Sequence, residues 1–230
     1  MTDDSQHPES DDPNGANGDP NAAVPKAVVS RLSLYLRELS QLIRDGRETT
    51  SSTQLGERLG LTDAQIRKDL TYFGQFGYPG IGYRCDELVT EIRRILGTDR
   101  DWPVAIIGLG NLGTALIGHR GFAEQGFRVT AAFETDESKV GTTQAGVPVF
   151  HIDQLSEIVK KDGIRLGILA VPAKAAQSVA QRLVEANIEG ILNFAPVTLS
   201  LPPTVSRVAV DLAIELEQLS FAVVNRLKNS

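Results

Sequence analysis

Apolar residues recur at intervals of three and four along the first part of the chain, a spacing that predicts amphipathic helices. Glycines end two of these patterns. At two helix starts a Ser or Thr is followed three positions later by Gln, as in a capping box. The expected helices cover residues 30–46, 51–60, 62–73 and 86–96.

From about residue 103 the pattern changes to short apolar runs that alternate with helical spacing. Continuous apolar runs are typical of parallel strands covered on both faces by helices. The alternation therefore predicts an α/β unit with a mostly parallel sheet. The expected strands cover residues 104–107, 129–133, 147–150, 166–171, 189–194 and 208–210, and a last helix runs to about residue 228.

The second and third expected helices are short and are joined by a tight glycine turn, as in a helix-turn-helix. The third helix projects polar side chains away from its apolar stripe, and these types can contact phosphates and base edges. Residues 78–84 contain two glycines and a proline, which predicts a hairpin that would form a wing. The alternative is a three-helix cluster that does not bind DNA, in which these polar side chains form an ordinary solvent-exposed face. The candidate DNA-binding residues are Gln65, Arg67, Lys68, Tyr72 and Arg84.

The net charge of −6 is concentrated in residues 1–25, which carry six acidic residues and neither Lys nor Arg. This segment has few large apolar side chains, so we expect a disordered acidic tail. Residues 26–96 carry eleven Lys and Arg against nine Asp and Glu, a weak but basic electrostatic footprint. No signal peptide or membrane span is expected, and a single cysteine, Cys85, fits a reducing cytoplasm.

A glycine-rich motif follows the first strand of the α/β unit. It consists of Gly108, Leu109, Gly110, Asn111, Leu112 and Gly113. A helix is expected behind it, from residue 111 to about 124. In a dinucleotide-binding unit the first glycine permits the tight turn, the second lets the backbone approach the pyrophosphate, and the third lets helix and strand pack closely. A tight turn without a ligand is the alternative.

An acidic residue, Glu134, ends the second strand, and Asp136 is close enough to take the same role instead. A carboxylate at this place accepts hydrogen bonds from the adenosine ribose and repels a 2′-phosphate. The spacing therefore favours NAD(H) over NADP(H).

Ligands of open α/β sheets lie beyond the carboxyl ends of the strands. Val171, Pro172, Asn193 and Phe194 fall at such ends and would border a nicotinamide, with Phe194 as an apolar wall. Packing at the strand ends is the alternative. Asp211 precedes the last helix and is expected to cap its N-terminus.

The last helix is apolar on more than one side. Leu212, Leu216, Leu219 and Val223 form one seam, and further apolar residues lie outside it. A partner subunit is the natural cover for such a helix. Burial within one chain is the alternative.

Four stretches together resemble one family. They are residues 65–77 (QIRKDLTYFGQFG), Gly80-x-Gly82-Tyr83, the glycine motif at 108–113, and residues 191–196 (ILNFAP). These stretches resemble the Rex family, the redox-sensing transcriptional repressors of bacteria. The resemblance covers about residues 26–228. It implies a homodimer that binds an inverted-repeat operator when NADH is scarce and releases it when NADH binds.

The resemblance also implies roles for single residues. Arg67, Lys68 and Tyr72 match recognition-helix positions, the glycine motif matches the pyrophosphate loop, and Asp211 matches an acid that couples cofactor state to interdomain contacts. Two positions depart from the family pattern. Glu134 stands where Asp is usual, which changes the reach of the carboxylate. His119 stands where a tyrosine of the sensing network is frequent, and we expect this difference to change the strength and pH dependence of NADH sensing.

A small NAD-dependent dehydrogenase is the main alternative function. It would need a proton donor beside the nicotinamide, and the chain offers there only His119 and His151 and no substrate domain. A nucleotide- or CoA-binding module would leave the recognition helix unexplained. We therefore expect an α/β protein without enzymatic activity and without a metal site. Its expected parts are the tail 1–25, a winged helix-turn-helix domain 26–97, a Rossmann NAD(H)-binding domain 98–211 and a dimerisation helix 212–230.

Overall fold

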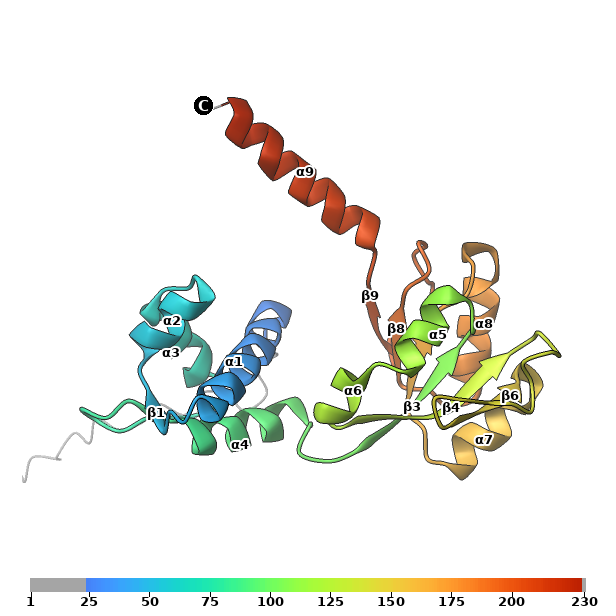
Figure 1. Ribbon diagram of the computed structural model, residues 1–230, viewed down its shortest axis with the longest axis horizontal. Helices are drawn as coiled ribbons and strands as arrows, with labels where there is room; N and C mark the ends of the chain where they lie inside the picture. Colours follow the sequence, from blue (N-terminus) through green and yellow to red (C-terminus); the bar gives the residue numbers. More distant parts are fainter. Residues whose placement is uncertain (1–23, 229–230) are drawn as a thin grey trace, which may run out of the picture. The chain divides into compact units, whose positions relative to one another are not determined.

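The computed structural model describes residues 24–228, so the predicted acidic tail lies almost wholly outside the described residues. The chain divides between Gly97 and Thr98 into two compact units (Figure 1). None of the helices in residues 24–228 is long and apolar enough to cross a membrane.

The first unit is a helical cluster with a small antiparallel sheet, in which strand β1 (Thr49–Thr50) pairs with β2 (Tyr83–Arg84). Its helices are α1 (Lys26–Arg44), α2 (Ser52–Leu59), α3 (Asp63–Thr71) and α4 (Cys85–Leu96). Side chains from all four helices form one core, and Leu32, Tyr35, Leu39, Leu55, Ile66 and Ile92 are fully buried in it. The apolar spacing in the sequence thus predicted the packing of this unit.

The starts of α2 and α3 differ in how they are capped. At α2 the predicted capping box is complete, because Ser51 accepts from the N–H of Gln54 and the Gln54 side chain accepts from the N–H of Ser51. At α3 Thr62 accepts from the N–H of Gln65, but the Gln65 amide binds Asp69 instead of returning to Thr62. The predicted second capping box is therefore only half formed.

The hairpin predicted at 78–84 is present only as one antiparallel bridge. Tyr78 and Gly82 form a single bridge at its tip, and β2 pairs with β1 instead of with the other arm of the hairpin. Gly82 has φ +88°, and a Cβ there would meet the carbonyl of Thr50, so only glycine lets the two segments approach. Cys85 is the buried first residue of α4 and not part of a strand.

Asp69 of α3 is buried and ties the helix to α1. Its carboxylate accepts from Arg31 Nε at 2.5 Å and Arg31 Nη2 at 2.8 Å, from the Tyr35 hydroxyl at 2.7 Å, and from the Gln65 amide at 2.7 Å. Burial alone would raise the pKa of Asp69, but these hydrogen bonds outweigh it and hold the pKa below its usual range. The carboxylate therefore stays ionised and fixes α3 against α1.

The second unit contains a seven-stranded sheet in the order β5-β6-β4-β3-β7-β8-β9. Apart from the antiparallel β5–β6 pair, neighbouring strands are parallel. From β6 to β9 this is the strand order of a dinucleotide-binding Rossmann sheet, with the reversal of order between β3 and β7. The strands are β3 (Trp102–Ile107), β4 (Phe127–Glu134), β5 (Thr143–Gln144), β6 (Val147–His151), β7 (Leu166–Leu169), β8 (Gly190–Asn193) and β9 (Ser206–Ala209).

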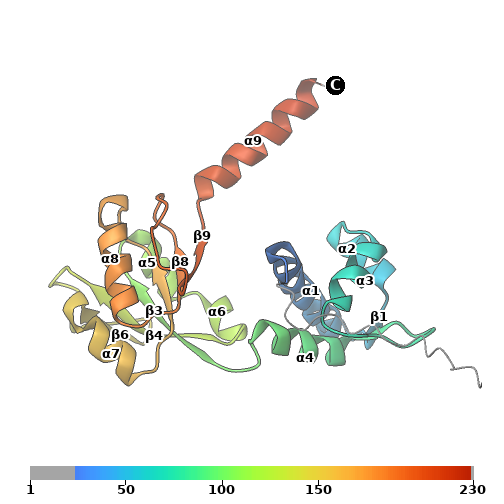
Figure 2. The same cartoon turned by 180° about the vertical axis from the view of Figure 1, so that it is seen from behind.

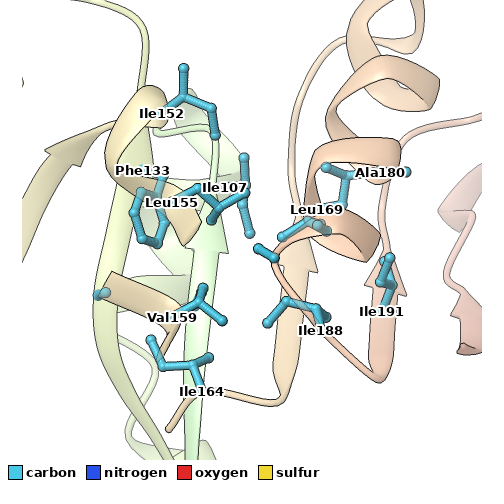
Figure 3. Close-up of a cluster of buried hydrophobic side chains, with 14 of the residues drawn as sticks. Ile107, Phe133, Ile152, Leu155, Val159, Ile164, Leu169, Ala180, Ile188 and Ile191 are labelled. Carbon is cyan, nitrogen blue, oxygen red and sulfur yellow. The ribbon is translucent and has the colours of Figure 1, made fainter. Parts of the chain in front are cut away.

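Helices cover the two faces of this sheet (Figures 1 and 2). The core between the sheet and α7/α8 includes Ile107, Phe133, Leu155 and Leu169 (Figure 3). A second core lies on the other face, against α5 and α6. The helices of this unit are α5 (Asn111–Ile117), α6 (Arg120–Glu124), α7 (Leu155–Lys161), α8 (Ala173–Glu185) and α9 (Leu212–Lys228), and a 3₁₀ turn, η1 (Ile152–Gln154), precedes α7.

The single helix expected from residue 111 to about 124 is wrong. Two shorter helices, α5 and α6, replace it, because Gly118 ends the first and His119 is the N-cap of the second in extended backbone. His119 consequently lies at a break between helices instead of on a helix face. The ring of His119 packs edge-on against Phe122, with centroids 4.9 Å apart.

The last helix, α9, buries none of its side chains against the rest of the chain. Leu212, Leu216, Phe221 and Leu227 are each at least 65% exposed. Asp211 caps it as predicted, since its carboxylate accepts from the N–H of Ala213 at 2.9 Å. An exposed apolar surface of this size marks α9 as a candidate interaction site.

We predict that Asp69→Ala lowers the free energy of unfolding by about 3 kcal/mol, because it leaves the buried Tyr35 hydroxyl and the half-buried Arg31 guanidinium without their acceptor. The exposed Glu57→Ala should change it by less than about 0.5 kcal/mol. Since the pKa of Asp69 is depressed in the folded state, its contribution is present above the unfolded pKa of about 3.9 and is lost as the pH falls through the folded value. Urea titrations of the two variants at pH 7 and near pH 3 measure this, and an equal effect of both variants at pH 7 would contradict it.

Candidate functional site

The glycine turn after β3 is shaped by close backbone contacts. Gly108 has φ +91°, and a Cβ there would lie 2.7 Å from the carbonyl oxygen of Ala170. A Cβ at Gly113 would overlap the carbonyl oxygen of Gly108, so the start of α5 packs directly on the turn. Gly110 has no neighbour within 4 Å of a Cβ, which leaves open space beside it. The first and third glycines are therefore required by packing, and the second faces the space where a ligand would lie.

The backbone of Leu109, between the first two glycines, is held on both sides. Its N–H donates to Glu134 Oε2 at 2.7 Å, and its carbonyl accepts from Lys139 Nζ at 3.0 Å. Lys139 also lies 3.7 Å from Asp136 Oδ2. The turn is thus fixed by side chains from the end of β4 before any ligand is bound.

Glu134 is held as an anion by backbone N–H groups. Its second oxygen, Oε1, accepts from Thr135 N at 2.7 Å and from Asp136 N at 3.3 Å. Burial alone would raise the pKa of Glu134, but the three N–H donors outweigh it, with a smaller contribution from Lys139, and lower the pKa. A charged carboxylate at the end of the second Rossmann strand suits ribose hydroxyls and repels a 2′-phosphate.

A cavity of about 600 Å³ lies beyond the carboxyl ends of β3, β4 and β7. Its ionisable lining is Glu134, Asp136 and Lys139, all from the β4 side. The remaining walls are mostly apolar. The predicted cofactor residues that line it are Gly108, Gly110, Asn111, Leu112, Glu134, Val171, Pro172 and Phe194. This is the position in which an open α/β sheet binds its ligand.

Three predicted cofactor residues do not line the cavity. Leu109 is buried and contributes its backbone N–H and carbonyl to the turn. Gly113 is buried under the turn. Asn193 is also buried: its amide donates to the carbonyls of Ala195 and Val197, and its oxygen accepts from the N–H of Ala195. Asn193 therefore shapes the loop after β8 and is not part of the cavity lining, and its contact with a nicotinamide stays a prediction.

The two predicted coupling residues also lie away from the cavity lining. His119 is exposed at the α5–α6 break, and Asp211 caps α9. The cap accounts for one of the two roles that the sequence left open for Asp211. The coupling role of both residues stays a prediction.

The predicted DNA-binding residues lie on α3 and β2. Lys68 and Tyr72 are exposed, and Lys68 has no ion pair among residues 24–228. Arg67 and Arg84 are exposed but paired with Asp63 and Glu87, at 2.6 Å and 3.3 Å. Gln65 is half-buried, and because its amide donates to Asp69 it is less available to a base than the sequence suggested.

Sequence reasoning missed Asp69 and Lys139. Asp69 lies three positions after Ile66, on the apolar stripe of α3, so its burial could have been predicted from the spacing. Lys139 gave no signal, because the carbonyl it binds is 30 residues away. Among the described residues, no group of three or more His, Cys, Asp or Glu side chains is arranged to hold a metal ion.

Two family models match the chain. The model described as "CoA binding domain" matches residues 99–197, and the model described as "Putative DNA-binding protein N-terminus" matches residues 23–71. Their boundaries fall within the two compact units. Coenzyme A is named only in the description of the first family model.

Curated relatives match over most of the chain. A redox-sensing transcriptional repressor Rex from Desulfitobacterium hafniense is 46% identical over 203 residues, covering 88% of this chain and 97% of the relative. The Rex of Streptomyces coelicolor is 47% identical over 198 residues, covering 86% and 77%.

Solved structures of RSP, a Rex-family repressor, have the same fold. The complex with β-NAD⁺ and operator DNA is 35% identical, covers 90% of this chain and 98% of that chain, and has a TM-score of 0.83. The complex with β-NADH is 34% identical, covers 89% and 96%, and has a TM-score of 0.81.

A helix-turn-helix unit joined to a Rossmann unit defines a transcription regulator that carries a dinucleotide-type site. The relatives make the assignment specific. The chain belongs to the Rex family of redox-sensing transcriptional repressors.

We predict that Gly110→Ala leaves the melting temperature unchanged and weakens NADH binding tenfold or more. The free protein has room for the methyl group at φ −69°, but the group would meet an approaching pyrophosphate, and overpacking costs about 1–3 kcal/mol. Gly118→Ala, which also adds a methyl without a clash, should change neither property. NADH fluorescence titration and thermal melting measure the two effects, and wild-type affinity in Gly110→Ala would show that the ligand lies elsewhere.

Proposed function

We propose that this chain is a homodimeric transcriptional repressor that binds an inverted-repeat operator and releases it when NADH binds. The observation that carries the proposal is the preformed glycine turn, held by the ionised Glu134, in a chain whose other unit presents an exposed recognition helix. Family membership supports the same function, because the relatives are redox-sensing repressors. We propose a cytoplasmic location, because a repressor must reach its operator DNA.

The ligand that suits the cavity is NAD(H). The turn and the start of α5, which has no side-chain cap, offer backbone N–H groups to a pyrophosphate. Glu134 accepts ribose hydroxyls at one end, and its charge disfavours NADP(H). Val171, Pro172 and Phe194 give the other end apolar walls that suit a nicotinamide ring.

Hydride transfer to a substrate is not part of the proposal. A dehydrogenase needs a proton donor or acceptor beside the nicotinamide. Here the ionisable groups of the cavity lining are all on the β4 side, with the ribose acid. The dinucleotide is therefore a regulatory ligand in this account, and the chain acts as a sensor.

A second copy of the chain is proposed as the cover for α9. An apolar cavity of about 440 Å³ lies on the α6 face of the sheet, lined by residues of β7, β8 and β9 such as Leu166, Ile168, Leu192 and Val208. The exposed apolar residues of α9 have the chemistry to fill such a groove on a partner. Reciprocal exchange of the two helices gives a two-fold dimer, and such a dimer fits a palindromic site.

The proposed switch is a change in the distance and angle between the two recognition helices. In the operator-binding state they match major grooves separated by whole turns of about 10.5 bp. NADH favours a dimer in which this match is lost. NAD⁺ leaves the operator-binding state populated.

We predict that NADH releases the protein from a fluorescently labelled inverted-repeat duplex at concentrations where NAD⁺ has little effect. The reason is that only a ligand with different affinities for the two dimer states can shift their populations. Fluorescence anisotropy measures the release. Lys68→Ala should bind the duplex more weakly but retain its NADH affinity, since Lys68 lies on the exposed face of α3. Equal release by NADH and NAD⁺, or by neither, would contradict redox sensing.

We predict that Leu219→Glu converts the dimer to monomers. The side chain is 57% exposed in the single chain, so the substitution leaves the fold of each subunit intact while it charges the proposed interface. Gln218→Glu adds the same charge at the neighbouring exposed polar position and should leave the dimer in place. Light scattering coupled to size-exclusion chromatography gives the masses. A dimeric Leu219→Glu would place the interface elsewhere.

A further inference from the structure

Two carboxylates form ion pairs with Arg67 and Arg84, the two arginines among the predicted DNA-binding residues. Arg67 Nη1 donates to Asp63 Oδ2 at 2.6 Å and to the Ser52 hydroxyl at 3.0 Å. Arg84 Nε lies 3.3 Å from Glu87 Oε1, and the other oxygen of Glu87 accepts from the Tyr78 hydroxyl at 3.1 Å. Each arginine therefore already has an anionic partner on the surface that would meet the phosphates.

These acids are neither buried nor needed to hold the core. The side chains of Asp63 and Glu87 are 42% and 46% exposed, and exposed pairs of this kind add little to stability. Asp69 is different, because it is buried and joins α3 to α1. Both acids lie in the first turn of a helix, which a negative charge stabilises modestly, and both also lie beside the candidate DNA contacts.

We propose that Asp63 and Glu87 are specificity-determining residues that lower the affinity of the repressor for random DNA. The inference rests on the proposed function. On random DNA an arginine gains only a phosphate, which replaces a carboxylate partner of similar strength, so the exchange yields little. At the operator the same arginine gains a base edge or a fixed phosphate, and such contacts exceed the loss of an exposed ion pair.

Lys68 provides the contrast on the same helix. It is exposed and has no ion pair among residues 24–228, so its contribution to phosphate binding needs no exchange. In this account Lys68 supplies general affinity for DNA. Arg67 and Arg84 contribute only where the DNA offers more than their acids do.

The test is the salt dependence of binding to random and operator duplexes by Asp63→Asn and Glu87→Gln. Asn at position 63 keeps an oxygen for the N–H of Ala64, which Asp63 caps at 2.6 Å. Each variant frees one arginine to neutralise one more phosphate. For random DNA the slope of log K against log salt should therefore steepen by about 0.9 per subunit. Affinity for random DNA should rise several-fold at low salt, and affinity for the operator should rise about twofold or less, the scale of an exposed i,i+4 pair.

Glu189→Gln is the matched control for charge. Glu189 pairs with Arg165 at 2.5 Å, is somewhat more exposed at 55%, and belongs to the Rossmann unit. It changes the net charge by the same amount and should leave the slope for random DNA unchanged. A slope that steepens equally in Glu189→Gln would reduce the effect to overall charge and overturn the proposal.

Other outcomes also decide the question. An unchanged slope in both Asp63→Asn and Glu87→Gln would overturn the proposal while leaving the repressor function intact. Loss of operator binding by a variant with the wild-type melting temperature would mean that the acid itself contacts the operator, and would overturn it as well. Wild-type protein that binds neither duplex would instead refute the proposed function, and with it this inference.

Discussion

The hydrogen bond from the Leu109 N–H to Glu134 joins the ends of the first two Rossmann strands, and the ligand site depends on it. It helps to set the path of the glycine turn and, together with the N–H groups of Thr135 and Asp136, keeps Glu134 ionised. Lys139 binds the carbonyl of the same residue, Leu109. A site fixed in this way loses little conformational freedom when a dinucleotide binds, so more of the binding energy is available to shift the balance between dimer states.

The DNA-binding unit uses carboxylates in two different ways. Asp69 is buried and sets the orientation of the recognition helix through Arg31 and Tyr35. Asp63 is exposed and pairs with an arginine on the outer face. The first interaction fixes α3 against α1, and the second is proposed to affect how readily Arg67 binds a phosphate. Burial separates the two roles, because a buried pair is costly to break and an exposed pair is exchanged easily.

Local patterns in the sequence were sufficient for the features that depend on neighbouring residues. The glycine motif, the acid at the end of β4, the capping box of Ser51 and the cap of Asp211 all follow from spacing along the chain. The pairing of β1 with β2 could not be predicted, since two-residue strands have no periodicity. The break at Gly118 and the inward turn of Asn193 depend on how the chain packs after the strands end. The bond from Lys139 to Leu109 depends on the folded sheet in the same way.

The most direct test of the account is the affinity of NADH with and without saturating operator duplex. If NADH and the operator favour different states of one dimer, each must weaken the binding of the other by the same factor. The account predicts that the duplex weakens NADH binding about 5- to 150-fold, which corresponds to a coupling of about 1–3 kcal/mol, and that the factor equals the loss of operator affinity in saturating NADH. The same NADH affinity in the presence and absence of operator would contradict it.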